Sequence, residues 1–282
     1  MVERFSARPE RPESKFKIII DEQSLAWNKE RQLERGDKKR TLYASDYGQC
    51  MRKIFFSHFP DEFDQGEFDP RTLRIFHNGE DVHRRLQDYL TKANIAFLEE
   101  VDVPRDELNV HGRCDGLAMM HNKFHVLEFK SINSDYVQGP KDEHEGQISW
   151  YMHMFELMRQ DLREEFSMPD GMSLTQEQLK DTVSSLRRKF DELTVVEKML
   201  LLSESEVQGE LIYEAKGTQQ IFAFPVQLDA GRFEKIRNWF KEMQQFVDKK
   251  ERPEVRYDKR KYPCQWKNGS CQFFKECYGE DP

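Results

Sequence analysis

The sequence His111-Gly112-Arg113-Cys114-Asp115-Gly116, followed after an apolar interval by Val126-Leu127-Glu128-Phe129-Lys130, holds the pattern on which the architecture depends. Both segments lie in apolar runs bounded by turn residues, which predicts two neighbouring strands. Side chains alternate between the two faces of a strand, so Glu128 and Lys130 share a face. We therefore expect Asp115, Glu128 and Lys130 to lie close together.

The strand pattern extends on both sides of this pair. A meander of three consecutive strands is predicted at residues 96–103, 108–119 and 123–132, and two further strands at 210–215 and 220–226. Helices are predicted at residues 21–39, after an N-cap at Ser45, and at 71–93, 145–162 and 232–249. The expected order is therefore helices, three strands, a helix, an insertion, two strands, a helix and a cysteine-rich end.

Composition divides the chain into parts of different character. Residues 1–16 are rich in Arg, Glu, Pro and Ser without an apolar period, which predicts a flexible tail. Residues 161–206 are highly charged and contain the break Pro169-Asp170-Gly171, which predicts a helical insertion. The C-terminal segment 262–282 holds three of the five cysteines. A length of 282 residues fits one elaborated domain or two small ones.

The charge balance excludes some classes of function. With 34% charged and 37% hydrophobic residues, the chain is typical of a folded polar protein. A net charge of -8 disfavours a protein that coats duplex DNA by neutralising its phosphates. No apolar run reaches the roughly 20 residues of a membrane-spanning helix, and residues 1–12 lack the apolar segment of a secretory signal. We expect a cytoplasmic protein without a membrane partner.

The residue types around Asp115 and Glu128 suit phosphodiester hydrolysis. Two carboxylates are hard oxygen ligands for Mg²⁺ or Mn²⁺, and the carbonyl of Phe129 could complete the protein's share of such a site. Lys130 would orient the attacking water or help to deprotonate it. The alternative is a surface strand with alternating charges. It is disfavoured because residues 124–132 are otherwise almost all apolar, and an unpaired buried charge costs several kcal/mol.

Four motifs in order resemble the RecB-type branch of the PD-(D/E)-x-K nuclease superfamily. They are His83, the segment 112–116, the segment 127–131, and Gln147-Ile148-Ser149-Trp150-Tyr151. The resemblance implies an α/β, restriction-endonuclease-like core with a mixed central β-sheet and flanking helices, formed as a single domain by residues 17–282. It also implies that His83 is a metal ligand and that Gln147 and Tyr151 order the site and contact the scissile strand. Without the resemblance, His83 is an ordinary helical histidine, and Gln147 and Tyr151 are an ordinary helix face.

The cysteines predict a second metal site. Cys50 is remote from Cys264, Cys271 and Cys277, and four thiolates suit zinc or an iron-sulfur cluster. One remote and three clustered ligands favour a cluster, and the chain resembles the CRISPR-associated and AddB-like nucleases, in which such a set holds a 4Fe-4S cluster that staples the two termini. The wide spacing between Cys264 and Cys271 departs from that family and keeps zinc as the alternative. Cys114 is expected to be a buried structural cysteine.

Three classes of function follow. The first is a Mg- or Mn-dependent DNA exonuclease that acts on free ends, often single-stranded, in recombination, repair, CRISPR adaptation or phage DNA metabolism. The second is a non-catalytic DNA-binding or scaffold protein of the same fold, disfavoured because none of the expected side chains is missing. The third is a sequence-specific or structure-specific endonuclease, for which residues 161–206 are the candidate recognition module. The expected setting is a bacterial, archaeal or phage-infected cell, with an oligomer or a recombination or CRISPR protein as a possible partner.

Overall fold

The computed structural model describes residues 14–35, 41–63, 66–93, 95–167, 176–266 and 269–279. Its centre is a five-stranded sheet with the order β1-β2-β3-β4-β5. The strands are β1 (Ala96–Asp102), β2 (Arg113–Met120), β3 (Lys123–Ile132), β4 (Gln208–Ala215) and β5 (Ile221–Val226). Only β3 and β4 pair in parallel, whereas the other neighbours are antiparallel. The prediction of an α/β fold with a mixed central sheet and flanking helices is confirmed.

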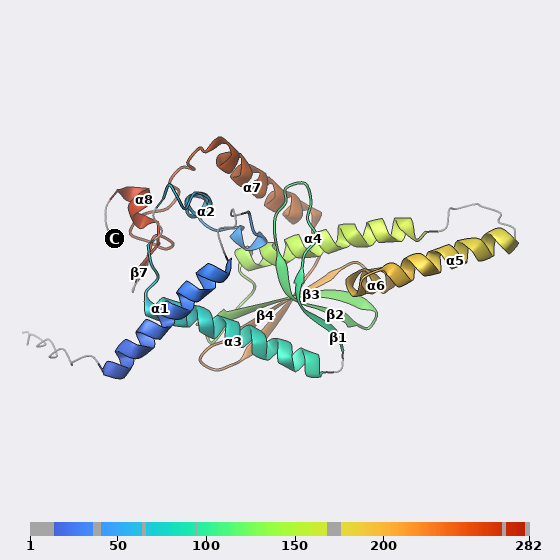
Figure 1. Ribbon diagram of the computed structural model, residues 1–282, viewed down its shortest axis with the longest axis horizontal. Helices are drawn as coiled ribbons and strands as arrows, with labels where there is room; N and C mark the ends of the chain where they lie inside the picture. The colour runs from blue at the N-terminus through green and yellow to red at the C-terminus, as the bar shows by residue number, and fades with distance from the viewer. Residues whose placement is uncertain are drawn as a thin grey trace, which may run out of the picture.

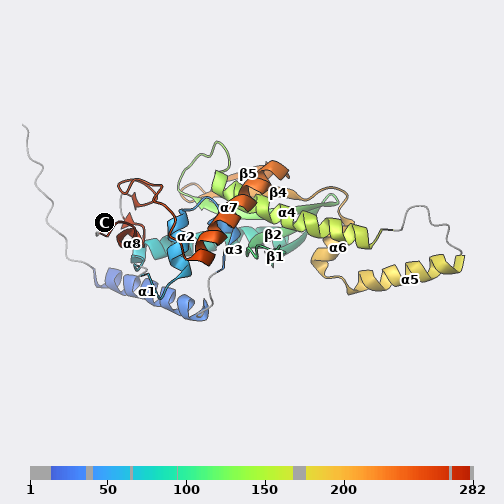
Figure 2. The same cartoon turned by 90° about the horizontal axis from the view of Figure 1, so that it is seen from above.

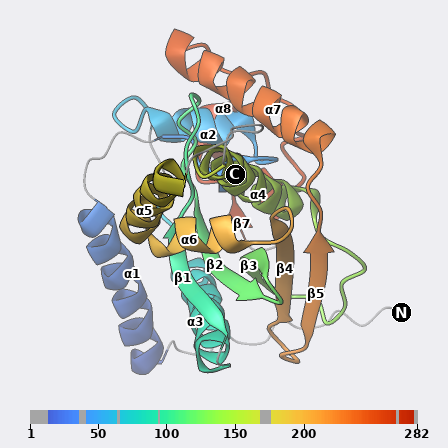
Figure 3. The same cartoon turned by 90° about the vertical axis from the view of Figure 1, so that its right-hand side faces the viewer.

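Helices cover both faces of this sheet (Figure 1). Helix α3 (Pro70–Lys92) packs against β1, β2 and β3, and α1 (Lys15–Arg35) lies on α3. On the other face, α4 (Asp142–Glu165) packs against β3, β4 and β5, with α7 (Ala230–Lys249) outside it, as the end-on view of Figure 3 shows. Strand β3 is therefore buried from both sides, which explains its almost continuous apolar sequence.

Local sequence sets the ends of the two helices that flank the site. Asp69 caps α3 by accepting hydrogen bonds from the backbone N–H groups of Arg71 and Thr72, and Pro70 begins the helix. On the opposite face, Lys141 precedes α4, whose first turn is acidic and complements the helix dipole. The cap of α3 and the acidic first turn of α4 favour the observed starts of these helices.

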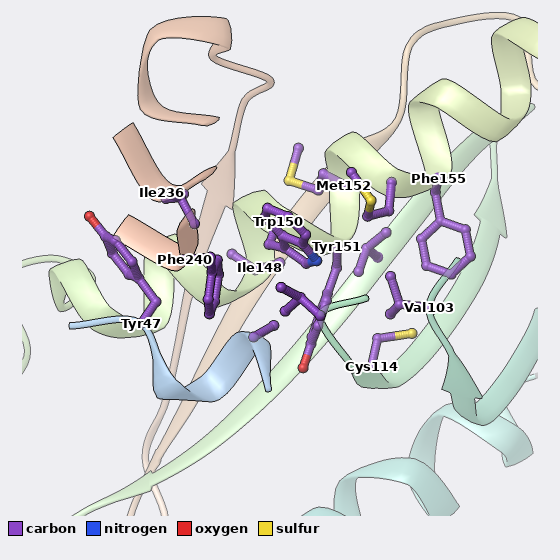
Figure 4. Packing of buried hydrophobic residues seen from close by; sticks show 14 of the residues in the cluster. Tyr47, Val103, Cys114, Ile148, Trp150, Tyr151, Met152, Phe155, Ile236 and Phe240 are labelled. Atoms are coloured by element: carbon purple, nitrogen blue, oxygen red, sulfur yellow. The ribbon is translucent and has the colours of Figure 1, made fainter. Parts of the chain in front are cut away.

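The main core lies between α4 and the sheet. Trp150, Met152 and Phe155 of α4 are fully buried, and Phe240 of α7 packs against Trp150 with 5.1 Å between ring centroids. Figure 4 shows these side chains together with Tyr151 and the strand residue Cys114. Because this helix is held on several sides, side chains that it directs at β3 have little freedom to move.

The region predicted as an insertion is helical where the structure describes it. Helix α5 (Gln176–Glu192) extends from one end of the molecule (Figure 2), and α6 (Val195–Leu202) returns the chain to α4. Glu156 accepts hydrogen bonds from Arg159 and from the backbone N–H of Val207, which ties the return segment to α4. Residues 168–175, including the predicted break at 169–171, lie outside the described residues.

Two segments that are far apart in the sequence meet at the opposite end of the molecule. Helix α2 (Met51–His58) lies near the C-terminal hairpin of β6 (Gln265–Trp266) and β7 (Gly269–Ser270) and near α8 (Phe274–Tyr278) (Figure 1). The rings of Phe56 and Phe273 are 5.5 Å apart, and the backbone N–H of Gly66 donates to the carbonyl of Gln272. Residues that are far apart in sequence are therefore packed together here.

Several predicted boundaries are wrong. Ser45 does not cap a helix: Ala44–Asp46 form one 3-10 turn, Gly48 has φ of 76°, and α2 starts at Met51 with Cys50 as its N-cap residue. Helix α1 begins at Lys15, so the predicted tail is too long by at least two residues, and residues 1–13 and 36–40 lie outside the described residues. Strand β2 begins at Arg113, because residues 104–112 form a connecting loop.

No helix in the described ranges combines the length and the apolar character needed to cross a membrane.

Candidate active site

The predicted acids lie where β2 and β3 separate. The paired register of these strands ends at Gly116 and Leu127, so Asp115 and Glu128 are the first residues beyond it. Oδ2 of Asp115 accepts a hydrogen bond of 2.6 Å from the backbone N–H of Phe129. The carboxylate of Asp115 thus takes the place of the backbone carbonyl that would otherwise continue the ladder of hydrogen bonds between the strands. This hydrogen bond holds the Asp115 side chain in one orientation.

Helix α3 brings His83 to Asp115. Nδ1 of His83 lies 3.1 Å from Oδ1 of Asp115, although the two residues come from different elements. Burial lowers the pKa of His83, but the hydrogen bond to Asp115 and its charge outweigh burial and leave the pKa raised. The predicted convergence of this histidine with the first acid is therefore present.

Glu128 is the more deeply buried of the two acids, with 2% of its surface exposed against 7% for Asp115. Its Oε1 accepts hydrogen bonds from Nζ of Lys130 at 2.6 Å and from Nε2 of Gln147 at 2.7 Å. Its Oε2 is buried and has no hydrogen-bond partner. Burial, and then the charge of Asp115, raise the pKa of Glu128 to about 7.

Helix α4 supplies the other side of the site. Gln147 donates from the same Nε2 to the hydroxyl of Tyr151 at 2.9 Å, so both predicted helix residues are linked to Glu128. Burial raises the pKa of Tyr151 well above its usual range, so Tyr151 stays protonated. Burial lowers the pKa of Lys130, but the charges of Glu128 and Asp115 reverse this effect, so Lys130 stays a cation.

The chemistry of this set fits a hard divalent cation. Among the described residues, no three His, Cys, Asp or Glu side chains are arranged ready to hold a metal ion. Protein groups are hydrogen-bonded to both oxygens of Asp115 and to Oε1 of Glu128. The unpartnered Oε2 of Glu128 is the exception, since a buried carboxylate oxygen without a partner is costly and a cation would satisfy it. The backbone N–H of Phe129 donates to Asp115. Metal binding by the backbone carbonyl of Phe129 stays a prediction.

The four cysteines predicted as ligands lie in the region where α2 approaches the C-terminal hairpin and α8. Cys50 is the residue before α2, the backbone N–H of Cys271 donates to the carbonyl of Cys264, and Cys277 lies in α8. Burial raises the pKa of Cys277 to about 11, and the charges of the other three thiols add to this effect. All five cysteines are free thiols, and the predicted burial of Cys114 is confirmed.

These thiols fit a soft metal by donor type. Thiolate charges that repel one another would be stabilised by a shared cation. Arg52 and Lys53 of α2 lower the pKa of Cys277 and Cys271 respectively, in opposition to burial. Four cysteine sulfurs suit an iron-sulfur cluster and a zinc ion alike, so both remain alternatives.

Two residues near the acids were not predicted from the sequence. Gln87 donates to the backbone carbonyl of Asp115 at 2.9 Å, and its position four residues after His83 on a helix was the available signal. His144 lies three residues before Gln147 on the same helix, and its Nδ1 is 3.0 Å from the hydroxyl of Tyr213. Both extend the polar rows that flank the acids.

Comparison with known proteins supports the fold. No protein-family model matches the chain, and no curated protein matches it. The chain is similar to the crystal structure of SSO0001, with a TM-score of 0.53 and 16% identity over 94% of this chain and 97% of that chain. It is also similar to a phage-related exonuclease from Haemophilus somnus 129PT, with a TM-score of 0.38 and 9% identity over 75% of this chain and 95% of that chain. The first likeness shows a shared fold, and the second is too distant to decide the chemistry.

Proposed function

We propose that this protein is a Mg- or Mn-dependent deoxyribonuclease of the PD-(D/E)-x-K type that hydrolyses DNA from free ends, with a preference for single strands. The observation that carries the proposal is the unpartnered, buried Oε2 of Glu128 beside Asp115 and Lys130. A purely structural ion pair between Glu128 and Lys130 would not require a second carboxylate and a histidine beside it. Two carboxylates, an imidazole and an ammonium group are side chains that suit metal-dependent hydrolysis of a phosphodiester.

Each side chain has a role in this proposal. Asp115, Glu128 and His83 would hold the cation, which when bound supplies positive charge to the phosphate and lowers the pKa of a water. Lys130, a cation hydrogen-bonded to Glu128, would position the attacking water and counter the charge of the phosphate. Gln147 fixes Oε1 of Glu128 and so leaves Oε2 for the cation. Tyr151 fixes Gln147 in turn.

We also propose that Cys50, Cys264, Cys271 and Cys277 hold a 4Fe-4S cluster, with zinc as the alternative. The support is that all four are free thiols and that neighbouring cysteines of the set raise the pKa of Cys271 and Cys277. The role would be structural, because crosslinking residues so far apart in sequence removes entropy from the unfolded chain. A cytoplasmic setting and a recombination or CRISPR protein partner belong to the same proposal.

A degradation assay tests the proposed function. The protein is incubated with end-labelled linear single strands, linear duplex and covalently closed circles, with Mg²⁺, with Mn²⁺ or with EDTA. We expect metal-dependent loss of the linear strands, intact circles, and no loss with Glu128→Gln. Cleavage of closed circles supports an endonuclease instead, and binding of DNA without any cleavage supports the scaffold alternative.

A further inference from the structure

A row of three polar side chains on α4 faces the site. His144, Gln147 and Tyr151 are spaced by three and four residues, which places them on one side of the helix. Gln147 and Tyr151 serve Glu128 by the hydrogen bonds given above. His144 continues the row toward Lys130, whose charge acts on it. The first member of the row therefore lies on the Lys130 side of the site, and it has no role in holding Glu128.

Tyr213 fixes the orientation of His144. Tyr213 pairs with Lys130 in the parallel register of β3 and β4, and its side chain is fully buried. Its hydroxyl oxygen accepts a hydrogen bond of 3.0 Å from the backbone N–H of Lys141 and lies 3.0 Å from Nδ1 of His144. A buried hydroxyl proton without an acceptor is costly, so Tyr213 donates its proton to Nδ1 of His144.

The hydrogen on the His144 ring is therefore on Nε2. The ring is neutral, because burial, and then the charges of Lys130 and Lys141, lower the pKa of His144 to about 3. A neutral imidazole carries one N–H, and with Nδ1 acting as the acceptor that group must be Nε2–H. The side chain is half-buried, and the hydrogen bond between Nδ1 and Tyr213 fixes the direction of its Nε2–H.

We propose that His144 is a substrate-positioning residue whose Nε2–H donates to a phosphate oxygen of the DNA strand beside the phosphate served by Lys130. The inference rests on the proposed nuclease function and names the part of the substrate that the row on α4 recognises, which is the sugar-phosphate backbone. A neutral donor recognises a phosphate oxygen without adding a further cation beside Lys130. Recognition of this kind is independent of base sequence.

Two variants separate this role from a merely structural one. His144→Asn keeps an acceptor at the position of Nδ1 for Tyr213 but removes the distal donor. His144→Gln keeps a donor near the position of Nε2 but does not place an acceptor at Nδ1. We expect His144→Asn to raise the KM for linear single strands by about tenfold, which corresponds to the loss of one hydrogen bond to a charged group. We expect the KM of His144→Gln to be much closer to that of the wild type.

A chemical substitution in the DNA completes the test. Methylphosphonate linkages, which lack the charged oxygen, are introduced one at a time into a short single strand, and affinity is measured by fluorescence anisotropy with Ca²⁺ replacing Mg²⁺. One linkage is expected to weaken binding of the wild type and to leave binding of His144→Asn unchanged. If Asn behaves as the wild type while Gln is defective, or if every linkage affects both proteins equally, the role is structural and the inference is wrong. Absence of cleavage by the wild type would instead overturn the proposed function itself.

Discussion

The backbone N–H of Phe129 donates to Oδ2 of Asp115 over 2.6 Å, and this bond joins β2 to β3 just beyond their last paired residues. The carboxylate of Asp115 is therefore part of the sheet as well as part of the candidate site. Such a double role makes the acid rigid, since its Oδ2 is held by the backbone and its Oδ1 by His83.

This relationship predicts different stabilities for two inactive variants. Asp115→Asn keeps an oxygen acceptor for Phe129, whereas Asp115→Ala leaves a buried N–H without a partner. We expect the Ala variant to be less stable than the Asn variant by about 1–3 kcal/mol in free energy of unfolding. Urea denaturation of the two proteins, both without added metal, measures the difference. Equal stabilities would mean that the bond is not formed in solution.

A pH dependence follows from Glu128, whose pKa is raised to about 7 in the folded protein. The folded state then binds a proton that the unfolded state releases at lower pH, so stability due to Glu128 is present below the unfolded pKa and is lost as pH rises through 7. Glu128→Gln removes this loss. Without divalent cations, we expect the melting temperature of Glu128→Gln relative to wild type to increase from pH 5 to pH 8.

The pKa of His144 is lowered, so its contribution to the pH dependence of stability has the opposite sign. His144 is present in both the wild type and Glu128→Gln, so this contribution cancels when their melting temperatures are compared. Added Mg²⁺ or Mn²⁺ is expected to stabilise the wild type more at pH 8 than at pH 5, because the cation binds the ionised acid. A melting-temperature difference between the two proteins that is constant with pH would place Glu128 in an ordinary, solvated environment.

A glycine tests the packing behind the site. A Cβ atom at Gly112 would lie 2.3 Å from Cε1 of Tyr151, whereas one at Gly139 would meet nothing within 4 Å. Gly112→Ala must therefore displace Tyr151, and with it the hydrogen bond from Gln147. We expect a loss of about 1–3 kcal/mol in stability together with reduced nuclease activity. Gly139→Ala is the matched control, and similar behaviour of the two variants would show that Tyr151 is loosely held.

The proposed metal site at Cys50, Cys264, Cys271 and Cys277 gives a prediction that does not depend on nuclease activity. Cys50→Ser is expected to lose bound metal and to unfold at lower temperature, whereas Cys114→Ala, at a buried cysteine outside the cluster, keeps the metal. Elemental analysis and visible absorbance of protein purified without oxygen distinguish iron with sulfide from zinc. Protein that contains neither metal would leave the four cysteines without the proposed role.

The sequence predicted the sheet well because its signals are local. Alternation and turn residues placed β3 at its observed bounds, and apolar residues at helical spacing placed α3 within one residue at each end. The segment around Ser45 was predicted poorly. Its apolar spacing is helical, but the positive φ of Gly48 and the burial of Asp46 are tertiary effects that a single sequence does not display.

The site was predicted in its members but not in its connections. The two acids and Lys130 were selected by residue type and spacing, and His83 by the family resemblance; the structure brings the four side chains together. The hydrogen bond of Asp115 to backbone, the unpartnered oxygen of Glu128 and the link from Tyr213 to His144 depend on contacts between distant elements. Such contacts leave no periodic signal in the chain.

Binding of Mn²⁺, followed by electron paramagnetic resonance or calorimetry, tests whether the histidine and the two acids form one cation site. We predict that the wild type binds Mn²⁺ and that His83→Ala, Asp115→Asn and Glu128→Gln each weaken binding by about tenfold or more. Lys130→Met should retain the ion while it loses cleavage by a factor on the order of 100 or more. Unchanged Mn²⁺ affinity in all three ligand variants is incompatible with a cation held between Asp115 and Glu128.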